Sequence, residues 1–405
     1  MTQLTTDLRF ASATSDAADT KAALGQLVHE LRPKLAGPID LMMVFATMDH
    51  LDGFAMIHDF LAEALGPRTL AAATCEGVLG MQREYESGPA ISVLAATMPG
   101  ARVEPIRIDE SDWPGVPDSE QGLAETLRLD AQALRCAVLL PDAFSTPAVV
   151  KMLPMCAEHY PDALIVGGMA GGSRKRGEGR LMIDGRIQRA GAVGLAIGGD
   201  IHVSTAVSQG CQPVGRKYII TRASNHYVQE LGGQGVVAVI GDVIASMTDA
   251  ERERAQSHGL LVGRVIDEYK DRFGRGDFLI RSILGVDQES GVMAVGDPDI
   301  RVGQTVQFHI RSQQTAETDL RLMLDMQKLH GPAAGALLFT CNGRGTRLFD
   351  APDTDVTIVH EALGDVPLAG FFAAGEIGRV GAQSFVHGHT ASMVLFRPAE
   401  QPLEA

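Results

Sequence analysis

Short apolar segments that run into glycine-rich turns recur along this chain, and helical patterns lie between them. The segments cover 68–80, 88–98, 162–172, 191–199, 335–345 and 366–378. Strands that alternate with helices in this way are typical of α/β layering, in which helices cover mostly parallel sheets. Glycine makes up 45 of the 405 residues, about 11% against an average of ~7%, while aromatic residues make up only 5%. The sequence therefore predicts a mixed α/β fold of layered mixed sheets with helices outside.

Two of these segments can be compared letter by letter and indicate an internal repeat. FLAEALGPRTLAAATCEGVLG (60–80) and IVHEALGDVPLAGFFAAGEIG (358–378) share EALG, an apolar strand and a turn that contains glycine and glutamate. Both have the order helix, strand, turn, and a strand follows each. We expect two related halves built on one pseudo-repeat, although unrelated α/β units can also look alike.

The stretch between these halves has a different pattern. Residues 223–233 predict a short helix, and T-x-x-E at 248–251 predicts a capped helix start. Segments 277–287, 290–296 and 304–312 alternate as antiparallel strands separated by turn residues. An amphipathic helix is expected over 317–330.

Charge and cysteine usage exclude several classes of function. The formal net charge is −15, which disfavours binding to nucleic acid or to an anionic membrane surface. The five cysteines form no CxxC pair, which argues against a disulfide framework and favours a reducing compartment. The N-terminus lacks the pattern of a signal peptide, and apolar runs of about ten residues are too short to span a bilayer. We expect a soluble, cytoplasmic protein.

One glycine-rich turn raises the question of an anion site. Gly171 and Gly172 end the strand at 162–172, and the basic segment SRKRGEGR (173–180) follows them. Backbone N–H groups at such a turn can hold an anion, but GGMAGG matches neither GxGxxG before a helix nor a P-loop. A sharp turn with a solvated basic tip remains the main alternative.

Two cysteines end buried strands and are candidate ligand contacts. Cys341 lies in TCNGRG beside Asn342 and Arg344, and Cys75 lies in TCEGVLG. A cationic neighbour and backbone N–H groups would favour a thiolate, and we expect the Arg344 guanidinium to clamp an anionic ligand. Each thiol could equally be a small buried residue at a strand end.

Two glutamates lie in similar turns. Glu76 follows Cys75, and Glu376 follows Gly375 after an apolar strand. If the two units face each other, both carboxylates could meet in one pocket and bind an amine, or each could accept backbone N–H bonds in its own turn. We expect Glu376 to line the main pocket between the domains.

The histidines do not form a metal-binding motif. None of the twelve shows HExxH or another zinc spacing, although His387 and His389 share one face of an extended segment. His202, His226 and His309 each lie near apolar runs and could serve as an axial haem ligand or as ordinary structural histidines. No nucleophile elbow or kinase motif is present. We therefore expect no metal, no required cofactor and no catalytic residues.

Four segments taken together resemble the FIST family of bacterial sensory proteins. They are ATCEGVLG with GPAISVLAATMPG; DALIVGGMAGG with GAVGLAI and the stretch from VSQGCQPVG to ELGG; GALLFTCNGRG; and VPLAGFFAAGEIG with FVHGHTASMVLF. The resemblance covers residues 38 to 397. It implies a lead-in and helix over 1–37, a FIST N-terminal domain over 38–230, a FIST C-terminal domain over 231–397 and a tail over 398–405.

The resemblance also implies a function. FIST proteins are described as sensors of small ligands such as amino acids or related metabolites, and they signal to a histidine kinase or a cyclic-nucleotide enzyme. One branch is said to bind haem and sense nitric oxide, which is the first alternative here. A thiol or carboxylate enzyme that uses Cys341 or Glu376 is the second. The residues carried over as ligand contacts are Glu376, Arg344, Asn342, Cys341, Gly375, Cys75, Glu76, Gly171 and Gly172.

Overall fold

The computed structural model describes residues 7–35, 37–116, 119–274 and 276–399, which divide into two compact units. Unit 1 is formed by residues 1–207, 320–386 and 391–405, and unit 2 by residues 208–319 and 387–390. Four sheets are formed by the described residues, three in unit 1 and one in unit 2. The predicted mixed α/β fold is confirmed.

Unit 1 is built from one motif that occurs three times. The motif is strand, helix, strand, helix, strand, hairpin, strand, and its three copies cover 9–97, 101–199 and 201–398, with residues 209–312 inserted in the third. The first copy is β1 (Arg9–Ser15), α1 (Thr20–Leu31), β2 (Leu41–Thr47), α2 (Met56–Leu65), β3 (Leu70–Cys75), β4 (Val78–Leu79), β5 (Glu84–Tyr85) and β6 (Ile91–Thr97). The second is β7 (Ala101–Ile108), α3 (Glu120–Leu127), β8 (Leu134–Pro141), α4 (Thr146–His159), β9 (Leu164–Gly168), β10 (Leu181–Ile183), β11 (Arg186–Gln188) and β12 (Ala192–Gly199). The third is β13 (Ile201–Ser208), α7 (Gln313–Gln327), β21 (Gly335–Cys341), α8 (Thr354–Leu363), β22 (Leu368–Ala373), β23 (Glu376–Val380), β24 (Gln383–His387) and β25 (Ala391–Pro398).

Each copy donates its hairpin to the sheet of another copy. The sheet orders are β1-β6-β2-β3-β10-β11, β24-β23-β9-β8-β12-β7 and β13-β25-β21-β22-β4-β5. The first hairpin joins β22, the second joins β3 and the third joins β9. Segments far apart in the sequence are therefore joined by backbone hydrogen bonds, and the two matched segments of the sequence occupy corresponding strands, β3 and β22.

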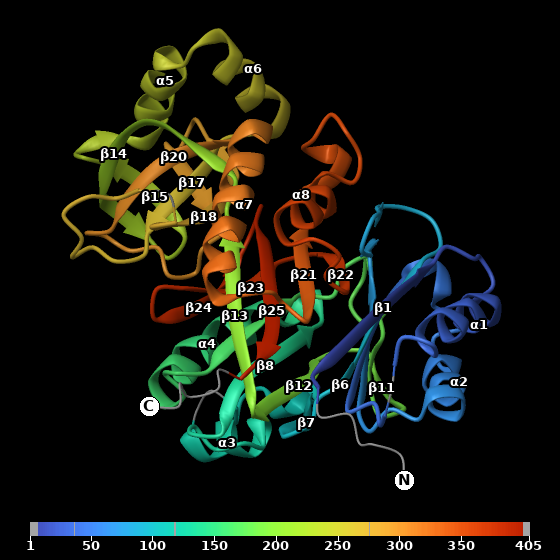
Figure 1. Cartoon of the computed structure of the whole chain (residues 1–405). Coiled ribbons are helices and arrows are strands. Elements are labelled where there is room, and N and C mark those ends of the chain that lie inside the picture. The colour runs from blue at the N-terminus through green and yellow to red at the C-terminus, as the bar shows by residue number, and fades with distance from the viewer. Residues whose placement is uncertain (1–6, 36, 117–118, 275, 400–405) are drawn as a thin grey trace. The chain divides into compact units, whose positions relative to one another are not determined.

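Each sheet of unit 1 has two apolar faces, and these faces determine how the sheets are layered. The inner faces share one core, which contains Phe45, Val138, Phe339, Phe371 and Phe396 from the three sheets. The outer faces pack on helices, and Figure 1 shows α1 and α2 beside the sheet of β1 and β6. The strands between these layers are buried on both faces, which is why they appear in the sequence as continuous apolar runs.

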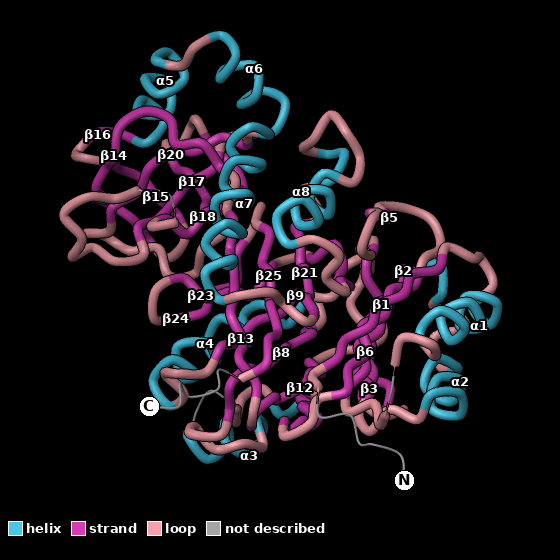
Figure 2. The backbone as a smooth tube through the Cα atoms, in the orientation of Figure 1, coloured by secondary structure: helices cyan, strands magenta, loops and turns pink. Residues whose placement is uncertain are grey.

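Unit 2 is a closed set of antiparallel strands. Its order is β14-β20-β17-β18-β19-β15-β16, and β14 also pairs with β15. Figure 2 shows these strands gathered together, with α5 and α6 to one side. The bounds are β14 (Cys211–Ser224), β15 (Tyr227–Leu231), β16 (Gln234–Gly235), α5 (Val236–Ser246), α6 (Asp249–His258), β17 (Leu261–Val265), β18 (Phe278–Asp287), β19 (Val292–Val295) and β20 (Thr305–Arg311).

The short helix expected over 223–233 is wrong. Residues Tyr227–Leu231 form β15, which pairs with β14 across a tight turn. Asn225 in that turn has φ 51°, a left-handed conformation that asparagine tolerates and that suits a hairpin. The hairpin then places Val228 and Leu231 in the core of unit 2.

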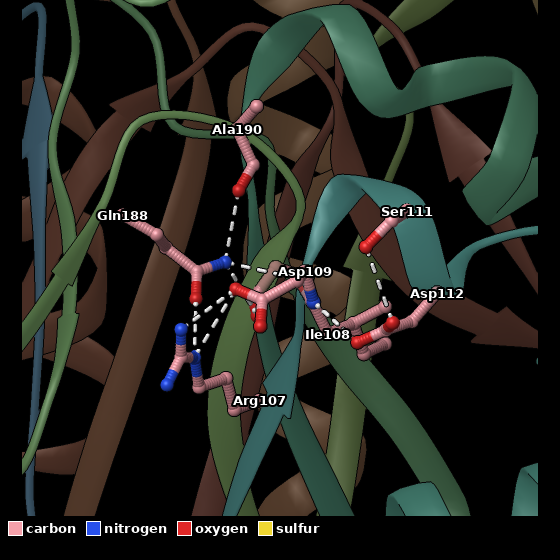
Figure 3. Close-up of polar contacts among 8 residues, drawn as sticks. Arg107, Ile108, Asp109, Ser111, Asp112, Gln188 and Ala190 are labelled. Atoms are coloured by element: carbon pink, nitrogen blue, oxygen red, sulfur yellow. Dashed lines mark hydrogen bonds and ion pairs between the residues drawn. The ribbon is translucent and has the colours of Figure 1, made fainter.

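The buried side chain of Gln188 links the hairpin of the second copy to neighbouring segments through hydrogen bonds (Figure 3). The Gln188 amide nitrogen donates to the carbonyl oxygens of Ile108 (3.0 Å), Ala190 (2.9 Å) and Ala192 (3.2 Å). The Arg107 Nε donates to the Gln188 side-chain oxygen at 3.1 Å. The two N–H groups of one amide are thus shared among three carbonyl groups on two segments.

We expect Gln188→Ala to lower the free energy of unfolding by about 1–3 kcal/mol, because buried carbonyl groups lose their donor. Urea denaturation measures the change, and Gln132→Ala at an exposed position is the control. A loss no larger than that of the control would mean that water replaces the amide without cost.

Candidate functional site

Most of the predicted contact residues meet where strands of unit 1 end. We call Cys75, Glu76, Gly171, Gly172, Cys341 and Asn342 the strand-end cluster. The Asn342 side-chain nitrogen donates to Glu76 Oε2 at 3.1 Å, although 266 positions separate the two residues. A side chain on Gly172 would place its Cβ 2.8 Å from the Cys75 carbonyl oxygen, so glycine is required there, where φ is 85°. The donated hairpins bring these distant segments together.

The thiols of this cluster are enclosed. Cys75 is fully buried and its Sγ donates to the Ala46 carbonyl oxygen at 3.4 Å. Burial raises the pKa of the Cys75 thiol far above its ordinary value, so this thiol stays protonated and is a poor nucleophile. Cys341 is 7% exposed, and its Sγ accepts from the Gly343 backbone N–H at 3.5 Å. Both cysteines therefore fit the packing alternative, and a ligand contact at either one stays a prediction.

Arg347, which no sequence motif singled out, adds two polar contacts to the cluster. Its Nη2 donates to Glu76 Oε1 and its Nη1 to the Asn342 carbonyl oxygen, both at 2.6 Å. The Glu76 side chain is 27% exposed and that of Arg347 56%. Arg347 follows Arg344 by three positions in the same glycine-rich loop, which was the only signal for it in the sequence.

The sequence predicted that Arg344 holds an anionic ligand, but its guanidinium holds a carboxylate of this chain, that of Asp355. The Arg344 side chain is fully buried, and its Nε and Nη2 donate to the two oxygens of Asp355 at 2.8 and 2.7 Å. Asp355 lies in the first turn of α8 and also accepts from Thr340 Oγ1 at 2.7 Å. The bidentate face that would hold an anionic ligand therefore already holds a carboxylate of the chain.

Glu84 is a second buried carboxylate beside this ion pair. Its Oε1 accepts from the Val356 backbone N–H at 3.0 Å, so it caps α8 from the donated hairpin β4–β5. Burial and the nearby charge of Asp355 raise the pKa of Glu84 to about 8. No local pattern singled out Glu84, because its partner lies 272 positions away.

Glu376 and Glu76 do not occupy equivalent positions. Glu76 directly follows β3, whereas Glu376 is the third residue after β22 and begins β23. Glu376 is fully buried and pairs with Gly168 of β9, and the Gly375 carbonyl oxygen accepts from Met169 N–H at 2.8 Å. The two carboxylates thus have different neighbours. A ligand contact at Glu376 stays a prediction.

Unit 2 contains a cavity that no sequence motif indicated. Its volume is about 260 Å³. The described lining residues are Gln209, Gly210, Cys211, Pro213, Phe273, Gly274, Gly276, Phe278, Gln307, His309, Thr315 and Asp319. Apolar rings and a few buried polar groups share this lining, the usual composition of a small-molecule site. These residues come from three segments, which the barrel strands β14, β18 and β20 and the start of α7 bring together.

The polar groups of this cavity are buried and hydrogen-bonded. The carboxylate of Asp319 is 5% exposed, and its Oδ2 accepts from the Gln209 backbone N–H at 3.0 Å. The His309 ring, 3% exposed, has its Nδ1 3.0 Å from the Gln307 carbonyl oxygen. Burial lowers the pKa of His309 to about 4, so the imidazole is neutral at physiological pH.

The cavity does not fit a haem. Its 260 Å³ is below the roughly 300–1,000 Å³ of pockets for drug-sized ligands, and a haem is larger than most such ligands. His309 cannot approach an iron through Nδ1, which is engaged with the backbone. His202 and His226 pack on the rings of His330 and Tyr227.

The described part of the chain contains neither a metal-binding cluster nor a helix that could span a membrane. No group of three or more histidine, cysteine, aspartate or glutamate side chains is arranged to hold a metal ion there. None of the helices described is both long and apolar enough to cross a membrane.

Two family models and several related proteins together match nearly the whole chain. The FIST N domain model matches residues 40–234 and the FIST C domain model residues 237–379. A protein of Mycobacterium tuberculosis (strain H37Rv), described as uncharacterized, is 36% identical over 392 residues, which are 96% of this chain and all of the relative. An uncharacterized protein of Mycobacterium bovis is 36% identical over 385 residues, covering 93% of this chain and 96% of the relative.

Among solved structures, a cyanuric acid hydrolase from A. caulinodans aligns with a TM-score of 0.36 at 9% identity. The alignment covers 97% of this chain and all of the hydrolase chain. This similarity is too weak to support a statement on activity.

Proposed function

The chain belongs to the FIST family, and on that premise we propose that it senses a small metabolite, an amino acid or a related compound, in the cavity of unit 2. FIST domains are in general sensory domains of signalling proteins that bind small ligands. The observation that supports this site is the cavity of about 260 Å³, whose lining includes a buried carboxylate and two phenylalanine rings. Its volume suits a metabolite of amino-acid size.

We propose binding without turnover, and output through a separate partner in the cytoplasm. The partner is a histidine kinase or a cyclic-nucleotide signalling enzyme, as the family resemblance implies. The five free, buried cysteines support a reducing compartment. The proposed site needs no cofactor, because carboxylate, imidazole and aromatic groups can bind a small ligand by themselves.

A thermal-shift screen against amino acids and related metabolites tests this function. A ligand at one hundred times its Kd adds about 2.7 kcal/mol to the free energy of unfolding, so a hit raises the Tm. We expect Thr315→Met to abolish the shift, because the longer side chain enters the cavity from the first turns of α7.

Thr318→Met is the matched control, since Thr318 lies one turn further along the same helix and is exposed. It should keep the full ligand-induced shift. Hits that stabilise the Thr315→Met protein as strongly as the wild type would place the ligand elsewhere, and a screen without hits would contradict the proposed function.

A further inference from the structure

Two of the described residues that line the unit 2 cavity, His309 and Asp319, carry acceptor groups that indicate what kind of ligand it takes. The Gln307 carbonyl oxygen can only accept, so the His309 Nδ1 must carry the proton and donate to it. In the neutral ring the other nitrogen, Nε2, is then an acceptor. No described residue donates a hydrogen bond to Nε2. The imidazole therefore offers a lone pair, and a ligand N–H or O–H would satisfy it.

Asp319 offers negative charge to the same cavity. The backbone N–H of Gln209 is a neutral donor to Oδ2, and none of the described lysine, arginine or histidine side chains forms an ion pair with this carboxylate. A buried carboxylate without a cationic partner is costly. A cation in the cavity would remove that cost.

Part of the remaining lining is apolar and limits the rest of the ligand. The rings of Phe273 and Phe278 meet edge to face, with centroids 6.1 Å apart, and Pro213 lies in the same lining. Lys217 Nζ lies 5.0 Å from the centre of the Phe273 ring, so this ring already contacts a cation. A short aliphatic chain fits such a wall, whereas a second charged group would need a partner of its own.

We propose that the cavity of unit 2 binds a primary amine in its ammonium form, with Asp319 and the His309 Nε2 as acceptors and the aliphatic part against Phe273 and Phe278. This inference rests on the proposed function and narrows its ligand class to amines without a carboxylate group, among the compounds related to amino acids. The charge of the carboxylate selects a cation, and the imidazole lone pair selects a donor of hydrogen bonds. Neutral alcohols meet only the second condition, and carboxylates meet neither.

Calorimetric titration of the full chain with three series of probes tests the proposal. The probes are primary alkylammonium ions from ethyl to hexyl, the alcohols of the same length and the carboxylates of the same length. We expect an alkylammonium ion to bind at least tenfold more tightly than its matched alcohol and the carboxylates not to bind, because a hydrogen bond from a charged donor to a carboxylate is stronger than one from a neutral donor.

Two variants on α7 locate the charge effect. Asp319→Asn keeps the shape of the side chain and should lose at least tenfold in affinity for the alkylammonium ion. Asp325→Asn, on the same helix but outside the cavity lining, removes an equal charge and should keep wild-type affinity. Urea denaturation of both variants shows whether each is folded, and the comparison among probes in the wild type does not depend on either variant.

Equal binding of alcohol and alkylammonium, binding of a carboxylate in the cavity, or an unchanged affinity in folded Asp319→Asn would overturn the ammonium assignment. If no alkylammonium ion binds while metabolites still give shifts that Thr315→Met abolishes, the amine class is wrong and the sensor function stands. If neither the screen nor the probes give binding, the sensor function itself fails.

Discussion

Asp355→Asn is expected to lower the free energy of unfolding by about 3–5 kcal/mol, the largest single effect we predict. The substitution leaves the Arg344 guanidinium buried without its charged partner, because both side chains are completely inaccessible to solvent. Thr340 loses its charged acceptor as well. Removing one member of a buried ion pair costs more than the pair contributes, since the remaining charge stays desolvated.

The exposed ion pair between Arg321 and Glu361 provides the matched control for Asp355→Asn. These side chains are 47% and 51% exposed, and their N–O distance is 2.6 Å. Glu361→Gln should change the free energy of unfolding by less than about 1 kcal/mol. Urea denaturation of both variants gives the comparison. Similar small losses in the two would show that water reaches Arg344 in the folded protein.

Glu84→Gln is expected to become more stable than the wild type as the pH rises. Burial raises the pKa of Glu84 to about 8 in the folded protein, whereas its ordinary value, which applies to the unfolded chain, is 4.5. Below pH 4.5 the carboxyl is protonated in both states. Between 4.5 and 8 the unfolded chain releases this proton while the folded one retains it, so the wild type loses stability through this window. Glutamine imitates the neutral form and avoids this loss.

The stability difference between Glu84→Gln and wild type should therefore grow with pH, to the order of 4 kcal/mol near pH 8. Urea denaturation at half-unit steps from pH 5 to pH 8.5 measures it, and subtraction cancels groups that titrate alike in both proteins. Glu63→Gln, at an exposed position of α2, controls for the loss of one negative charge. A difference for Glu84→Gln that stays constant with pH would contradict the protonated state of this carboxyl.

The sequence predicted the layers of unit 1 well, because local patterns determine them. The apolar segments 68–80 and 88–98 contain β3 and β6, and the helix expected before the first of them is α2, which ends at Gly66 with φ 61°. Glycine in a left-handed C-cap is a local signal. The exchange of hairpins was not predictable in the same way, since β4 pairs with β22 across almost 300 positions and no local pattern specifies that partner.

The candidate site shows the same limit. Residues next to strand ends, such as Cys341 and Glu76, could be singled out because glycine turns mark them in the sequence. Asp319 looked like one polar residue of an amphipathic helix, and His309 like an ordinary buried histidine. Their importance arises only when the strands of unit 2 close around a cavity.

Hydrogen-exchange mass spectrometry with a ligand from the screen tests the central claim most directly. Bound ligand should slow exchange in the described segments that line the cavity, 209–213, 273–274, 276–278 and 307–319, and leave the strand-end segments 75–77 and 341–347 unchanged. That pattern would confirm that unit 2 holds the ligand. Protection confined to 75–77 and 341–347 would contradict the account and move the ligand to the strand-end cluster.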